Sequence, residues 1–280
     1  MAKGTVPGRT AAASPRVRRG YFECRYGQLH VHNSIPPGGG FDEATSLICL
    51  HDFPLSGRMF HRLLGVLGRD RSTYAPDLPG YGASDAPTAR PSIADYAAAI
   101  ADFCDLMRFR QVDLLGFHSG ALVATELALA RPAVVRRVVL LGVPLPSESE
   151  REAFRRVPWP IAPQEDGGHL PIEWRRSLEM RGAGVPLATL ARNFADKLSH
   201  GAEASWGIAA ALNYPLRERL AAVTQPVLIL RARDALSEST ARARELHPRA
   251  RFADLADPGS EPLETAPEAI ASGLRDFTRG

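Results

Sequence analysis

Short apolar runs alternate with longer helical patterns along most of this chain, and this alternation constrains its fold more than any other feature. Each apolar run is short enough for a buried strand, and the segments between them place apolar residues at helical spacing with Ala-rich interiors. Such an order predicts parallel β-α-β units with helices on both faces of one sheet. We predict strands at 46–50, 72–75, 112–116, 138–141, 227–230 and 251–255, and helices at 93–107, 121–130, 238–246 and 267–277.

The N-terminal part follows a different pattern. Residues 21–26 and 29–34 flank Gly27-Gln28, which predicts an antiparallel hairpin at a sheet edge. Residues 1–20 are basic, rich in small residues and without an apolar signal-peptide core, so we expect a disordered basic tail there.

The strand pattern stops between residues 147 and 220. In that stretch Pro-rich loops alternate with amphipathic helical segments, which predicts an inserted helical cap. A length of 280 residues fits one α/β domain with such an insertion. We therefore expect a core made of 21–146 and 221–280, with the cap at 147–220.

Composition excludes several classes of protein. Hydrophobic residues make up 45% and charged residues 23%, as in ordinary globular proteins, and no run is long enough to span a membrane. The net charge of +3 comes from arginines scattered among acids, which does not indicate a nucleic-acid surface. Three widely spaced cysteines favour free thiols in a reducing, cytoplasmic compartment. No metal or organic-cofactor motif is visible, so none is expected.

Three local motifs occur in order along the chain. LHDFP at 50–54 follows a predicted strand, DLPGYGASD at 77–85 forms a glycine-rich loop, and LLGFHSGALVA at 114–124 joins a strand to an Ala-rich helix. Together they resemble the oxyanion loop, the glycine-rich loop and the nucleophile elbow of the α/β-hydrolase family, which includes esterases, epoxide hydrolases and dehalogenases. The resemblance covers about 21–280 and implies the α/β-hydrolase fold, a mostly parallel sheet flanked by helices with an inserted helical cap.

The residues expected for a Ser-His-Asp triad are displaced. In the elbow Gly-x-x-x-Gly, His118 stands where the family has Ser, Cys or Asp, and Ser119 comes one place later. At the acid position stands Ala235, with Asp234 just before it, and Ser260 stands where the family has His. The resemblance therefore implies a degenerate triad, with His118 as acid, base or nucleophile, oriented by Asp234 and Ser260.

Further candidates surround this elbow. The resemblance implies an oxyanion hole formed by the backbone N–H groups of Phe53 and Ser119. In relatives, the residue that matches His51 bonds the glycine-rich turn, and His51 is also a candidate for the substrate site. Asp52, which replaces a Gly, is either a solvated loop residue or a carboxylate at the pocket mouth. Trp206 is a candidate for the substrate cleft. The remaining histidines are expected on the surface or on helices: His30, His32, His61, His169, His200 and His247.

Three interpretations of function remain open. One is an enzyme that uses His118 on a small apolar ester- or carbonyl-containing molecule, by atypical hydrolysis or by lyase- or isomerase-type chemistry. Another is a non-catalytic ligand-binding protein that kept the pocket and lost the triad. The third is a serine esterase that uses Ser119, although adjacent side chains on a tight turn diverge. All three imply a small-molecule ligand and no nucleic-acid or membrane partner. They are also compatible with a homodimer.

Overall fold

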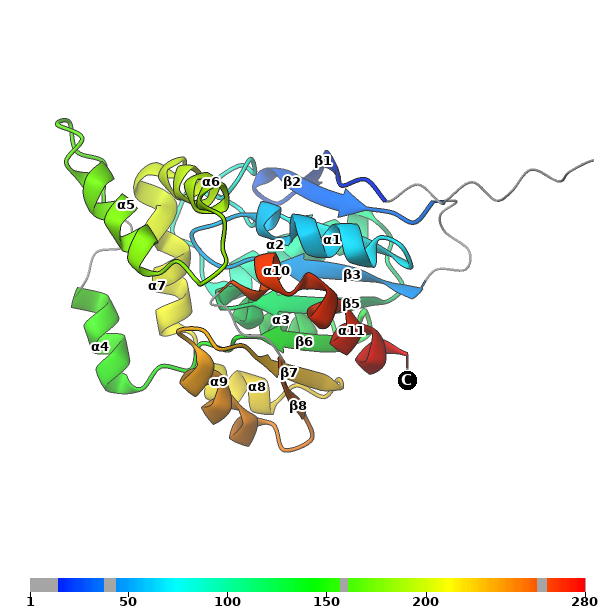
Figure 1. The fold of residues 1–280 in the computed structure, drawn as a ribbon. Helices are drawn as coiled ribbons and strands as arrows, with labels where there is room; N and C mark the ends of the chain where they lie inside the picture. Colours follow the sequence, from blue (N-terminus) through cyan, green and yellow to red (C-terminus); the bar gives the residue numbers. More distant parts are fainter. Residues whose placement is uncertain (1–14, 38–43, 157–160, 256–260, 280) are drawn as a thin grey trace, which may run out of the picture.

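A single twisted sheet organises the molecule (Figure 1). The computed structural model describes residues 15–37, 44–156, 161–255 and 261–279. The strands lie in the order β1-β2-β4-β3-β5-β6-β7-β8; β1–β2 and β2–β4 are antiparallel and the other neighbours are parallel. Their bounds are β1 (Arg18–Cys24), β2 (Gly27–Ser34), β3 (Ala44–Leu50), β4 (Arg71–Pro76), β5 (Val112–Phe117), β6 (Val135–Leu141), β7 (Val227–Arg231) and β8 (Arg251–Asp254).

Helices cover both faces of this sheet, as the alternating pattern predicts. One core layer lies between the sheet and α2 (Ile93–Leu106), α3 (Ser119–Ala130) and α8 (Leu216–Ala221). The other lies beneath α1 (His61–Leu67), α10 (Pro262–Thr265) and α11 (Pro267–Thr278). Central strands β4 and β5 are buried along their whole length, because both of their faces are covered.

The predicted elements agree closely with the structure, with two corrections at the N-terminal edge. The hairpin turns at Arg25 and Tyr26, since Cys24 pairs with Gly27, so the predicted turn was placed two residues late. Arg18–Gly20 belong to β1, so the predicted tail is wrong for these residues; residues 1–14 lie outside the described part of the chain. The helical segments η1 (Gly57–Phe60) and α1, which follow β3, were not predicted from the sequence.

The described residues of 147–220 form helices joined by loops, with no strand among them. This stretch holds α4 (Glu148–Arg156), α5 (His169–Glu179), α6 (Leu187–Leu198), η2 (Gly201–Ser205), α7 (Trp206–Asn213) and most of α8. Helices α5 and α6 pack on each other and project from the sheet at the left of Figure 1, and α4 buries none of its residues. The division into core and cap stays an interpretation. Among the described residues, no helix has the length and apolarity required to cross a bilayer.

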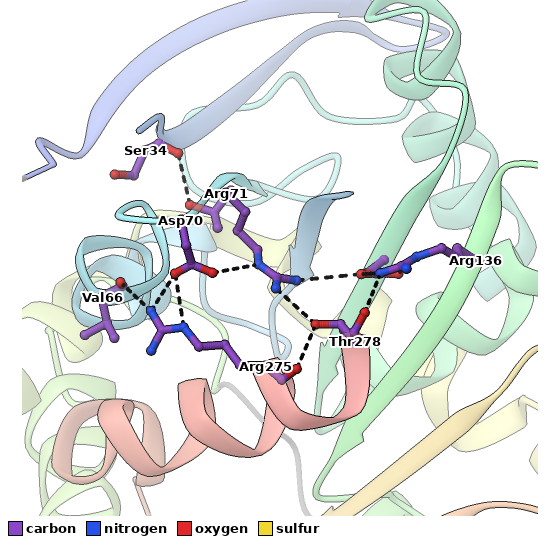
Figure 2. Close-up of polar contacts among 9 residues, drawn as sticks. Ser34, Val66, Asp70, Arg71, Arg136, Arg275 and Thr278 are labelled. Atoms are coloured by element: carbon purple, nitrogen blue, oxygen red, sulfur yellow. Dashed lines mark hydrogen bonds and ion pairs between the residues drawn. The ribbon is translucent and has the colours of Figure 1, made fainter. Parts of the chain in front are cut away.

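A network of ion pairs closes the end of the sheet where the parallel strands begin (Figure 2). The Arg71 guanidinium, 2% exposed, donates to Thr278 Oγ1 at 3.0 Å and lies 3.7 Å from the fully buried Asp113 carboxylate. Arg136 donates twice to Asp113, and Arg275 of α11 donates to Asp70. We call this group the closed cluster; its members are Asp70, Arg71, Asp113, Arg136, Arg275 and Thr278.

Candidate active site

The elbow lies between the last residue of β5 and the first residue of α3. His118 has φ 50° and ψ −118°, a strained conformation for a non-glycine residue. A Cβ on Gly120 would lie 2.0 Å from Leu50 O, and one on Gly116 would lie 2.5 Å from Ala121 Cα, so neither position admits a side chain. The sharp turn presents His118, as the sequence predicts.

Two carboxylates flank the His118 ring. Asp234, from the loop after β7, places Oδ2 at 2.9 Å from Nε2, and Asp52, from the loop after β3, places Oδ2 at 3.4 Å from Nδ1. Gly142, with φ +69°, leaves the room that this ring occupies, because a Cβ there would lie 2.5 Å from His118 Cδ2. The position just before the family's acid therefore still delivers a carboxylate to the elbow.

This arrangement favours the imidazolium form of His118. Burial opposes the positive charge, but the hydrogen bonds and charges of Asp234 and Asp52 outweigh it and raise the pKa of His118 to about 9. For Asp52, burial likewise opposes ionisation, while hydrogen bonds from His118 and Ser119 lower the pKa of the carboxyl. At neutral pH His118 is therefore a cation, and it lies between the carboxyl groups of Asp234 and Asp52.

Ser119 lies behind Asp52 and is 7% exposed. Its hydroxyl donates to Asp52 Oδ1 at 2.6 Å and accepts the Phe53 N–H at 2.8 Å, while its own N–H donates to Asp52 Oδ1 at 3.1 Å. Both amides expected to form the oxyanion hole thus have partners within the protein. The Asp52 carboxylate occupies the hydrogen-bonding position that an oxyanion would take on the Ser119 amide.

A cavity of about 610 Å³ opens beside this group. It lies between the elbow, the η1–α1 segment, α5 and α6, and the segment that leads into α10. Asp52, His118 and Asp234 line it; Ser119 does not. Apolar lining residues are Phe53, Pro54, Leu55, Met59, Phe117, Met180, Leu190, Phe194, Ala235 and Leu263. Charged and polar side chains from η1, α1, α6 and the segment before α10 also line it, so the cavity suits a largely apolar ligand with a polar group directed at His118.

Comparison with known proteins identifies the family of this chain. Residues 45–200, more than half of the chain, match the family model described as the alpha/beta hydrolase fold. This chain belongs to the α/β-hydrolase family.

Several of its curated relatives are named as esterases. A pimeloyl-(acyl-carrier protein) methyl ester esterase of Aeromonas hydrophila is 28% identical over 106 residues, but the match covers only 36% of this chain and 39% of that relative. The same-named protein of Photobacterium profundum is 26% identical over 253 residues, which are 85% of this chain and 96% of the relative. The solved enol-lactonase of Burkholderia xenovorans superposes with a TM-score of 0.76 at 16% identity, over 93% of this chain and all of that one, which shows a shared fold.

The other predicted site residues have separate outcomes. His51 is fully buried, does not line the cavity and accepts the Leu78 N–H on Nε2 at 2.8 Å, so it bonds the glycine-rich turn as the sequence predicts. Trp206 is half-buried at the start of α7 and is not among the cavity-lining residues. Ser260 lies outside the described residues.

The histidines of the hairpin require a correction. His30 and His32 are buried, not exposed, because they alternate along β2 on one face and meet the Asp77 carboxylate beneath the glycine-rich loop. Among the described residues, these three form the group whose arrangement most resembles a metal site, since one ligand atom of each lies within 4.8 Å of the others. Asp77 already accepts the N–H groups of Gly57 and Ala83, so its observed role is to join β2, η1 and the glycine-rich loop.

The sequence did not predict the part that two acidic residues play in the cavity. Asp52 was expected to be either solvated or at the pocket mouth, and it lies instead at the centre of the site. The sequence feature that could have indicated this is an Asp where the family has a Gly. Glu261 also lines the cavity, where burial and then the nearby Glu264 charge raise the pKa of its carboxyl. No local motif marked Glu261, because only the approach of the segment before α10 brings it there.

Proposed function

We propose that this protein is an enzyme that acts on a small, mostly apolar ester- or carbonyl-containing molecule by acid–base chemistry. His118 is the acid and Asp52 is the base. The observation that carries the proposal is the pair His118 Nδ1 and Asp52 Oδ2, 3.4 Å apart and both on residues that line the cavity. The relatives named as esterases support an ester or a related carbonyl compound as substrate.

The flanking carboxylates support a distinct role for each group. An imidazolium with N–H on both nitrogens has no lone pair, so His118 at neutral pH is an acid and not a nucleophile. Asp234 holds Nε2–H, and Nδ1–H, which faces Asp52 Oδ2 at 3.4 Å, also donates to the carbonyl oxygen of a substrate that enters between them. This donor takes over the work of the oxyanion hole, because the amides of Phe53 and Ser119 are engaged.

Asp52 is the matching base. Its Oδ1 accepts both the amide and the hydroxyl of Ser119, which hold the carboxylate ionised and oriented, while Oδ2 faces His118. In this position Oδ2 takes a proton either from the carbon beside the carbonyl or from an attacking water. The first course is isomerase- or lyase-type chemistry, and the second is hydrolysis without a serine nucleophile.

The proposal is tested with a panel of esters, lactones and enolisable ketones. We expect turnover, or exchange of the α-hydrogen in deuterated water, that falls at least about 100-fold in Asp52→Asn and in His118→Ala. Ser119→Ala serves as the control, because it removes only the hydroxyl that orients Asp52 and should retain more activity than either. Equal rates in wild type and His118→Ala would sink the proposed role of the imidazolium.

A second candidate function is ligand binding without catalysis. It is favoured by one observation, that the polar atoms of Asp52, His118 and Ser119 pair with one another. Ligand-induced thermal stabilisation with neither turnover nor hydrogen exchange across the panel would favour this candidate. A serine esterase has less support, since Ser119 does not line the cavity; a fluorophosphonate that labels Ser119 would revive it.

A further inference from the structure

Helices α5 and α6 bring a lysine to the wall of the cavity. Among 34 lysines and arginines, the chain has lysine only at positions 3 and 197, and residue 3 lies outside the described part of the chain. Lys197, on α6, is 7% exposed and lines the cavity together with Ser177 of α5. Its Nζ donates to Ser177 Oγ at 3.3 Å, so the amine itself lies against a residue of the cavity wall. The acid–base chemistry proposed for His118 makes no use of this amine.

Two cations share one buried carboxylate beside this amine. Glu173 of α5 is fully buried; its Oε2 lies 3.2 Å from Lys197 Nζ, and its Oε1 accepts from Arg176 at 3.1 Å. A guanidinium stays protonated in proteins, so Arg176 continues to neutralise Glu173 when Lys197 gives up a proton. Burial opposes the ammonium and, together with the charge of Arg176, outweighs the attraction of Glu173, so that the pKa of Lys197 is lowered.

The choice of lysine at this position points to chemistry in addition to ion pairing. Arginine is the better partner for a buried carboxylate, because its planar group forms two parallel hydrogen bonds and is weakly hydrated. A primary amine has a lone pair once it loses a proton, and this lone pair attacks carbonyl carbon. Leu190 and Phe194 of α6 line the same cavity and make part of its wall apolar. An apolar aldehyde or ketone that enters the cavity therefore meets an amine.

We infer that Lys197 is a covalent binding site for aldehydes and ketones, which it holds as an imine. Nζ passes a proton to Glu173 and bonds to the carbonyl carbon, while the π electron pair of the carbonyl group moves to oxygen, which takes that proton. The hydroxyl group of this carbinolamine then takes a second proton from nitrogen and leaves as water, as the nitrogen lone pair closes the C=N bond. Overall, an ammonium and a carbonyl compound give an iminium ion and water, so the charge beside Glu173 is unchanged. The inference rests on the proposed function only for the class of ligand, a carbonyl compound.

Reductive trapping measures the imine directly. The full chain is incubated at pH 7 with 4-methylbenzaldehyde and sodium cyanoborohydride, which reduces C=N to a stable secondary amine, and mass spectrometry of a digest locates the label. The reference is Arg110→Lys, which places a lysine at an exposed position before β5, at the other end of this strand from the elbow. Lys197 should be labelled at least about ten-fold faster than this reference, because burial favours its neutral form and the cavity holds the aldehyde next to it. Labelling of Lys197 no faster than the reference, or no label on it, would overturn the inference.

Two further variants test the shared carboxylate. Arg176→Gln removes the second cation from Glu173, which favours the ammonium form of Lys197, and should slow labelling several-fold. The matched control is Arg175→Gln, which removes the same charge from the neighbouring, exposed residue and should be labelled at nearly the wild-type rate. Circular dichroism verifies that both variants are folded. Equal labelling of the two variants would contradict the role given to Arg176.

His118→Gln separates this inference from the proposed function. This variant should lose turnover across the panel and still be labelled at Lys197 as fast as wild type. If turnover depends on His118 but wild type shows no preferential label, the inference fails and the proposed function stands. If Lys197 is labelled in a protein that turns over none of the panel, the proposed function fails and the inference stands.

Discussion

Two charged clusters lie at opposite ends of the parallel strands of the sheet, and they differ in their access to solvent. At the end where the strands finish, His118 sits between Asp52 and Asp234, and its side chain keeps 17% exposure toward a cavity. At the end where the strands begin, Asp113 sits among arginines and is fully buried, as is Arg71 at 2% (Figure 2). Both clusters join a buried carboxylate to cations.

The difference shows that charge clustering alone does not make a site. The loops that follow β3, β5 and β7 diverge where the strands end, so side chains there border a crevice, as is general for open α/β sheets. The other end is covered by α11, whose Thr278 accepts from Arg71 through its hydroxyl and from Arg136 through its carbonyl. The same kinds of groups are available for chemistry at one end and serve only to hold the fold at the other.

The largest effect should come from breaking the cluster of Asp52, His118 and Asp234, which we call the open cluster. His118→Gln removes the acid and is expected to lower kcat/KM by 100-fold to 10,000-fold, the usual range for a general acid or base. The fold should persist, because the stranded carboxylates border the cavity and can be hydrated. Turnover of the substrate found in the panel, together with circular dichroism of the variant, checks both statements, and a rate within two-fold of wild type would contradict the first.

Breaking the closed cluster should affect stability and not activity. Asp113→Ala removes the only carboxylate paired with Arg136 among the described residues, leaves the buried Arg71 with Asp70 alone at 3.4 Å, and is expected to lower the free energy of unfolding by about 3–5 kcal/mol. Urea unfolding measures this change. The control is Asp105→Ala, which removes an exposed pair with Arg131 and should cost less than about 1 kcal/mol. A large loss of kcat in folded Asp113→Ala would contradict the separation of the two ends.

The open cluster should also make stability depend on pH. Because the folded pKa of His118, about 9, lies above its unfolded value of about 6.5, its contribution is fully present below pH 6.5 and is lost as pH rises through 9. The loss amounts to about 3 kcal/mol, taking about 1.4 kcal/mol for each pH unit. The measurement is urea unfolding of wild type and His118→Gln at pH 6 and pH 10. The difference between the two proteins should shrink at the higher pH; an unchanged difference would argue against a charged His118.

A smaller effect should come from crowding the ring. Gly142→Ala places a methyl group 2.5 Å from His118 Cδ2 in a left-handed backbone, and it should cost about 1–2 kcal/mol for the backbone alone. It should also push the ring from Asp234 and return the pKa of His118 toward 6.5, which a histidine NMR titration follows. Gly184→Ala has a similar positive φ with open space around its Cβ, so it should show the backbone effect without the pKa change.

Much of the fold was predictable because it follows from the local periodicity of apolar residues along the chain. The parallel strands and the helices at 93–107, 121–130 and 267–277 follow from apolar spacing, and the elbow follows from two glycines at fixed distance. The same local rules failed for His30 and His32. Their alternation in β2 shows that they share a face, but which face is buried depends on Asp77 and the glycine-rich loop, about 45 residues away along the chain.

By itself the sequence determined the family, the sheet and the presence of an imidazole at the elbow, because each depends on residues that are neighbours along the chain. Only the tertiary structure decided that Asp52 turns inward to Ser119, that Asp234 reaches Nε2 of His118, and that His61 connects the cavity to a buried carboxylate. The contacts involved, Asp52–Ser119, His118–Asp234 and His32–His61, join residues that are 67, 116 and 29 positions apart. The charge state of a group in such a pair depends on burial and on the partner it meets, and neither exists until the separate strands have packed into one sheet.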